Sequence, residues 1–119
     1  MINRAVLNEE KDIYLDENFD WSGYIQVSSK NEGNIVKGIY LDKILADLPK
    51  VDFIRFDIQG SEMKAIKGAM DLIKRSPDCI LTMEYETRFL NNFHNTSYSL
   101  RVLTDLEKLG YFFFKVSSN

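Results

Sequence analysis

Two acidic residues at the ends of predicted strands are the first candidates for chemistry. Asp57 lies at the end of the apolar stretch 51–58 and precedes Gly60, and Glu84 lies near the end of the stretch 79–85. If these strands are parallel neighbours, both carboxylates open onto one edge of the sheet, where ligands bind in open α/β proteins. Convergent carboxylates could bind a cation or divide acid and base roles. Two alternatives stay open. The pair could be two solvated acids that never meet, and Asp57 by itself could be an acid that accepts hydrogen bonds from backbone N–H groups of its turn.

Three other residues could take part at this edge. The single histidine, His94, lies in a predicted polar loop over residues 86–96, and such loops often carry active-site residues. A lone histidine more often makes a local hydrogen bond, so both interpretations stay open. Ser61 and Glu62 open the predicted helix after the turn, where serine is a common N-cap and a negative charge favours the helix dipole. We therefore favour structural roles for these two.

Composition narrows the classes of protein to which the chain can belong. Its 119 residues, 45% hydrophobic and 28% charged, predict one globular domain over 1–119. The net charge of −3, with acids and bases interleaved, argues against nucleic-acid binding. No apolar run is long enough to span a membrane, and the N-terminus has no signal-peptide pattern. The single cysteine, Cys79, lies in an apolar run and predicts a buried structural thiol, in keeping with a cytoplasmic location.

The elements that must position these residues fall into two parts. Residues 1–40 predict a β-rich part with strands at 4–7, 12–15, 24–28 and 35–40, the last two forming a hairpin around the turn 31–34. Residues 41–119 alternate, with helices at 41–48, 61–75 and 99–109 and strands at 51–58, 79–85 and 111–116.

This β-α-β-α-β order predicts an α/β fold with a mixed sheet. The strands at 51–58 and 79–85 should be parallel neighbours. The nearly continuous apolar residues of 51–58 predict a strand that is covered on both faces. No glycine-rich nucleotide loop, P-loop or zinc-ligand spacing is present in the sequence, so no metal site is predicted.

A pattern in several parts resembles the FkbM-type methyltransferases. Its central part is the strand that ends in Asp57, the turn with Gly60, Glu62 at the start of a helix, and Ala-Ile-Lys-Gly-Ala at 65–69. A Leu-Asp pair at 41–42 precedes it, and a strand ending in glutamate follows it. The resemblance covers residues 35–85 well and the remainder loosely.

The resemblance implies a partial Rossmann-like methyltransferase fold with S-adenosylmethionine as methyl donor. The reaction would be O-methylation of a hydroxyl on a sugar or another small molecule. Asp57 and Gln59 would lie on the cofactor side, and Asp57, Glu84 and His94 are the candidate catalytic residues. The resemblance does not decide which of them acts as the base.

The family's glycine-rich cofactor loop precedes the matched segment, and this sequence lacks it. We therefore expect the C-terminal portion of a methyltransferase domain, inactive or incomplete on its own. The edge of a central parallel strand would then be unpaired, which favours aggregation. We expect the β-rich part or a second copy to cover this edge, and we predict a homodimer. Two alternatives stay open: a non-enzymatic assembly module on the same scaffold, and a hydrolase or metal-binding protein that uses Asp57, Glu84 and His94.

Overall fold

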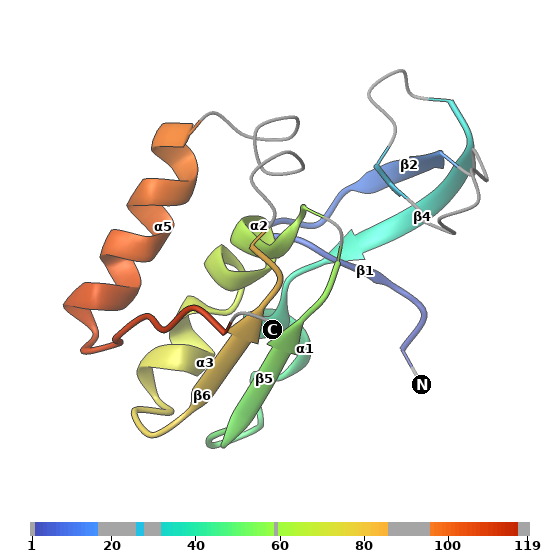
Figure 1. The fold of residues 1–119 in the computed structure, drawn as a ribbon. Helices are drawn as coiled ribbons and strands as arrows, with labels where there is room; N and C mark the ends of the chain where they lie inside the picture. Colours follow the sequence, from blue (N-terminus) through green and yellow to red (C-terminus); the bar gives the residue numbers. More distant parts are fainter. Residues whose placement is uncertain (1, 17–25, 28–31, 59, 86–95, 117–119) are drawn as a thin grey trace.

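The computed structural model of the protein describes residues 2–16, 26–27, 32–58, 60–85 and 96–116. The strands are β1 (Ala5–Val6), β2 (Asp12–Asp16), β3 (Gln26–Val27), β4 (Asn34–Ile39), β5 (Phe53–Phe56) and β6 (Ile80–Met83). The helices are α1 (Leu41–Ile44), α2 (Glu62–Lys67), α3 (Met70–Lys74) and α5 (Thr96–Lys108). The fold is therefore mixed α/β, as the sequence predicts (Figure 1).

The β-rich N-terminal part forms one sheet in the order β1-β4-β2-β3. β1 runs parallel to β4, whereas β2 is antiparallel to both of its neighbours. The predicted hairpin between 24–28 and 35–40 is wrong, because β2 lies between β3 and β4. β2 is five residues long and pairs with β4 from Asp12↔Lys37 to Leu15↔Asn34, whereas the two-residue β3 pairs only with the end of β2.

The second sheet pairs β5 with β6 in parallel, in the register Phe53↔Ile80 to Phe56↔Met83. This confirms the predicted neighbours. The prediction that β5 is covered on both faces is wrong. Ile54 and Phe56 point toward the helices, while Phe53 and Arg55 on the other face are exposed. In the described part of the chain, the helices pack against one face of this sheet (Figure 1).

One apolar cluster joins the helices to the inner face of β5 and β6. Its buried members are Phe56, Met63, Ala65, Ile66, Ala69, Ile73, Val102 and Leu106. α5 contributes the last two and packs against α2. The 3.6-residue periodicity correctly predicts the inward residues of α2 and α3, such as Met63, Ile66 and Ile73. On α5 it places Leu100 on the same face as Leu106, but Leu100 is 55% exposed and Val102 is buried instead.

The predicted helix over 61–75 is two helices, α2 and α3, which meet at Gly68 and Ala69. The cause is a side chain from another element. The carboxylate of Asp42 accepts the backbone N–H groups of Asp71 (3.0 Å) and Leu72 (2.8 Å), which would otherwise bond to carbonyls one turn earlier. Asp42 therefore acts as a distant N-cap for α3.

This cap gives a first prediction about stability. The Asp42→Ala variant should lose about 1–2 kcal/mol of unfolding free energy, the usual effect of removing an N-cap. Urea unfolding followed by circular dichroism measures the change. Asp47→Ala is the matched control, since Asp47 is exposed in the turn after α1. Equal losses in the two variants would contradict a capping role for Asp42.

The other element bounds also differ from the sequence predictions. α1 is a single turn and not the helix predicted over 41–48; the Arg75 guanidinium donates to the carbonyls of Leu45 (2.8 Å) and Leu48 (3.0 Å) just after it. α5 begins at Thr96 and not at residue 99. Residues 111–116 do not form the predicted strand.

The chain turns away after α5 at Gly110, which adopts a positive φ of 93°. Gly110 N–H donates to the Glu107 carbonyl and Tyr111 N–H to the Leu106 carbonyl, the bond pattern of a Schellman motif. The aromatic segment after this turn is highly exposed, at 84% for Phe112 and 88% for Phe114. Its run of aromatic residues indicates a strand by propensity, but no strand pairs with it in the described structure.

Candidate functional site

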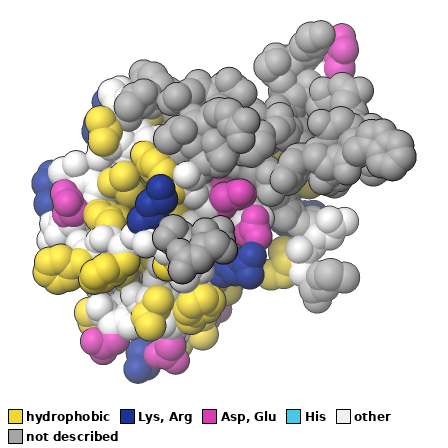
Figure 2. Space-filling model, in the orientation of Figure 1, with side chains coloured by type: hydrophobic (Ala, Val, Ile, Leu, Met, Phe, Trp, Pro, Cys, Tyr) yellow, Lys and Arg dark blue, Asp and Glu magenta, His cyan; other side chains and the backbone are white. Residues whose placement is uncertain are grey.

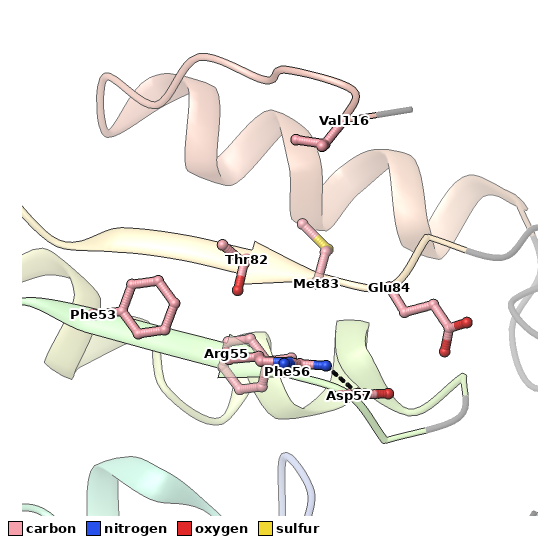
Figure 3. Close-up of a pocket in the computed structure, with 8 residues that line it drawn as sticks. All are labelled: Phe53, Arg55, Phe56, Asp57, Thr82, Met83, Glu84 and Val116. Atoms are coloured by element: carbon pink, nitrogen blue, oxygen red, sulfur yellow. Dashed lines mark hydrogen bonds and ion pairs between the residues drawn. The ribbon is translucent and has the colours of Figure 1, made fainter. Parts of the chain in front are cut away.

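The carboxyl ends of β5 and β6 lie beside an open groove of about 560 Å³. Its lining residues are Phe53, Arg55, Phe56, Asp57, Thr82, Met83, Glu84 and Val116 (Figure 3). Parallel pairing brings the two strand ends together, and the Glu84 N–H donates to the Phe56 carbonyl at 3.2 Å. Asp57 and Glu84 therefore reach the same groove, as parallel pairing predicts.

Asp57 forms an ion pair with Arg55. Its Oδ2 lies 2.7 Å from Nη2 of Arg55. The two side chains share one face because they stand two residues apart along an extended chain. Both are exposed, so the pair adds little to stability. Among the described residues of the turn, no backbone N–H group donates to Asp57.

Glu62 makes those turn bonds instead. Its carboxylate accepts Ile58 N–H at 2.9 Å through Oε1 and Gly60 N–H at 2.8 Å through Oε2. The side chain is only 1% exposed. Gly60 has φ of 98°, a conformation that glycine adopts readily and other residues rarely do. The structural role favoured for Glu62 is confirmed: it holds the β5–α2 turn beside Asp57.

Ser61 occupies the N-cap position of α2, as expected, but its side chain makes no capping bond. The neighbouring Glu62 carboxylate satisfies backbone donors of the turn before the helix, and not those of the first turn of α2. Glu84 extends from the end of β6 on the groove side (Figure 3). Within the described residues its carboxylate has no ion-pair partner.

Two of the predicted site residues, Gln59 and His94, lie outside the described residues. Among those that are described, no group of three or more histidine, cysteine, aspartate or glutamate side chains could hold a metal ion. Cys79 is buried, as predicted, and burial raises the pKa of its thiol. A raised pKa lowers the thiolate fraction near neutral pH, which fits a structural residue better than a nucleophile.

Sequence reasoning missed Arg55 as part of this site. The signal was available, since an arginine two residues before Asp57 on a strand must share its face. Phe53, Thr82 and Val116 also line the groove without having been predicted. The first two lie on the outward face of the sheet, which was expected to be covered.

The fold and the groove define an α/β protein in which two parallel strands end in carboxylates beside a glycine turn. This arrangement is compatible with a methyltransferase-like fold. A family model described as the methyltransferase FkbM domain matches residues 4–113, and the chain belongs to this family. A search of curated proteins and a search of solved structures each found no match. No helix in the described part of the chain has the length and apolar character needed to cross a membrane.

Proposed function

We propose that the chain takes part in methyl transfer from S-adenosylmethionine to a hydroxyl group of a sugar or another small molecule. The supporting observation is the family match over 4–113, combined with the groove that Asp57 and Glu84 share. In this proposal the β5–β6 pair belongs to a Rossmann-like sheet, and its carboxyl edge is the site. The buried free thiol of Cys79 is in keeping with a reducing compartment, and we propose the cytoplasm.

The residues of the groove fit the charged end of S-adenosylmethionine. This cofactor supplies a methyl group on a positively charged sulfur, and its amino-acid end carries an ammonium and a carboxylate. Asp57 can accept hydrogen bonds from the ammonium, and Arg55 can donate to the carboxylate. The sequence contains no glycine-rich loop to hold the adenosine end. We therefore propose that these 119 residues alone bind the cofactor weakly and transfer methyl groups slowly or not at all.

Glu84 is the better candidate for the general base. The Arg55 guanidinium already contacts the Asp57 carboxylate, whereas Glu84 lines the groove without an ion-pair partner among the described residues. A carboxylate in this position can take the proton of the acceptor hydroxyl as its oxygen becomes methylated. Asp57 would then bind the cofactor's ammonium and orient the cofactor. Its position is fixed by the ion pair with Arg55 and by the turn whose N–H groups donate to Glu62.

Calorimetric titration with S-adenosylmethionine and S-adenosylhomocysteine tests the proposal. We expect weak binding to the wild-type chain, weakened roughly tenfold further in Asp57→Asn through loss of a charge-assisted hydrogen bond. Asp52→Asn is the matched control, because Asp52 lies just before the start of the same strand and its side chain is 89% exposed. It should bind like the wild type.

The absence of heat with either ligand at millimolar concentration would contradict the binding proposal. Binding without detectable transfer of a labelled methyl group would support a chain that is incomplete on its own.

A second candidate function is a non-enzymatic assembly module. The observation that favours it is the set of exposed apolar side chains on the open face of β5 and β6 and on the segment after α5, with Phe53 57%, Ile80 62% and Val116 93% exposed.

A further inference from the structure

The outer edge of β5 presents backbone groups that no strand in the described structure pairs with. The bonds from Ile80 N–H to the Asp52 carbonyl (3.0 Å) and from Glu84 N–H to the Phe56 carbonyl (3.2 Å) show which residues of β5 face β6. Backbone groups alternate in direction along a strand, so those of residues 53, 55 and 57 point to the opposite edge. An edge of this kind is a template for another strand.

Arg55 and Asp57 give this edge a pair of opposite charges that can match the same pair on a second copy of the chain. Arg55 and Asp57 lie two residues apart, on one face and on the free edge, and carry opposite charges. We propose that a second copy of the chain pairs its β5 antiparallel to this one across a two-fold axis at Phe56. Arg55 then lies opposite the partner's Asp57, and Asp57 lies opposite the partner's Arg55. Symmetry makes each contact occur twice.

The charges of Arg55 and Asp57 also favour this register over the two registers in which the axis is shifted to Arg55 or to Ile54. Centring the axis on Arg55 would place two arginines opposite each other, and like charges in that position are destabilising. Centring it on Ile54 would place Phe53 opposite the partner's Arg55 and leave Asp57 without a cation across the interface. With the axis at Phe56, residues 55 and 57 form hydrogen-bonded pairs, in which opposed residues exchange both N–H···O bonds. Backbone and side chains then favour the same register.

Exposed apolar side chains adjoin this edge. Phe53 is 57% exposed and Ile80 62%, and they are paired on the outward face of β5 and β6. Val116, 93% exposed, lines the same groove as Phe53. Figure 2 shows hydrophobic side chains gathered over β5, β6 and the segment after α5. Exposed apolar surface of this kind marks interaction sites, and edge pairing would cover part of it.

The dimer goes beyond the proposed function and stands independently of it. It would also change the groove, because the partner's Arg55 would lie beside Asp57. Each groove would then contain a guanidinium from the other copy. Oligomeric state and cofactor binding are separate measurements, so failure of one proposal leaves the other testable.

Sedimentation equilibrium over a range of protein concentrations tests the pairing. The wild type should form a dimer. Arg55→Asp places carboxylates opposite each other and Asp57→Arg places guanidinium groups opposite each other, so each should weaken the dimer roughly tenfold or more, about 1.4 kcal/mol. An equimolar mixture of the two variants should associate again, because opposite charges then meet at every pair. Arg101→Asp on α5 is the matched control and should dimerise normally.

Circular dichroism verifies that each variant is folded; if a reversal fails to fold, Arg55→Gln replaces it and should weaken the dimer to a smaller extent. A wild type that stays monomeric at high concentration would overturn the proposal. So would a dimer that neither reversal weakens, since its contact would lie elsewhere. Two weakened variants that fail to associate when mixed would overturn the register.

Discussion

We expect the Glu62→Ala variant to lose about 4 kcal/mol of unfolding free energy, the largest effect of any single substitution outside the apolar core. The carboxylate accepts two backbone N–H groups, those of Ile58 and Gly60, in a buried position. Hydrogen bonds to charged groups contribute about 1.5–3 kcal/mol each, and buried donors left without a partner are costly. In the described structure no other carboxylate accepts the Ile58 and Gly60 N–H groups.

Glu62→Gln separates the hydrogen bonds from the volume of the side chain. The amide oxygen can keep one of the two bonds, while the amide N–H₂ group faces the other donor, so we expect a loss of about 2 kcal/mol. Urea unfolding measures both variants, with Glu107→Ala on the exposed face of α5 as control, expected within about 0.5 kcal/mol of wild type. A Glu62→Ala variant as stable as this control would show that the turn does not depend on the carboxylate.

Outside the apolar core, Gly68→Ala should be the second most damaging substitution, with a loss of about 3 kcal/mol from overpacking. A Cβ at this position would lie 2.1 Å from the Leu7 carbonyl oxygen and 2.9 Å from Cβ of Tyr40. The first of these is backbone, which cannot move aside as a flexible side chain can. The φ of Gly68 is −78°, an ordinary value for any residue, so the effect would arise from space alone.

Gly110→Ala is the matched comparison. Gly68 has an ordinary φ but no space for a Cβ, whereas Gly110 has space for a Cβ but an unusual φ. Gly110 has a positive φ of 93°, and a Cβ there would meet no atom within 4 Å. We expect a loss of about 1 kcal/mol, the strain of a left-handed conformation for an L-residue. Thermal unfolding of the two alanine variants checks the order. If Gly110→Ala were the more damaging, the close approach of Leu7 to Gly68 would not be a constraint on the fold.

The sequence correctly predicted those elements that are determined by residues close together in the chain. The apolar stretch 51–58, the Gly60 turn and the periodic helix after it are each defined by neighbouring residues, and their order is enough to predict the parallel pairing of β5 and β6. The break between α2 and α3 could not be found this way. It depends on Asp42, which lies 30 residues before Leu72 in the chain. Periodicity along one helix does not reveal an acceptor supplied by another element.

The same distinction applies to sheet pairing and to the candidate site. The order of strands in the first sheet depends on which partner offers the longer pairing, and a turn between 24–28 and 35–40 does not show that β2 pairs with both flanking strands. Asp57 and Glu84 could be placed at one edge because parallel strands end together. The spacing of Arg55 and Asp57 was enough to place both side chains on one face. Their exposure was missed because the apolar composition of β5 predicted no open face.

Hydrogen bonds between the α1 region and the α3 region connect the two ends of residues 42–76, and this affects how the stretch folds. Asp42 bonds to Leu72, Arg75 to the Leu45 carbonyl, and the Ser76 hydroxyl accepts Val51 N–H. All three close nearly the same loop, so most of the entropy of loop closure is lost when the first contact forms, and the others follow at little further loss. We therefore expect residues 42–76 to gain amide-exchange protection together and to open as one cooperative unit.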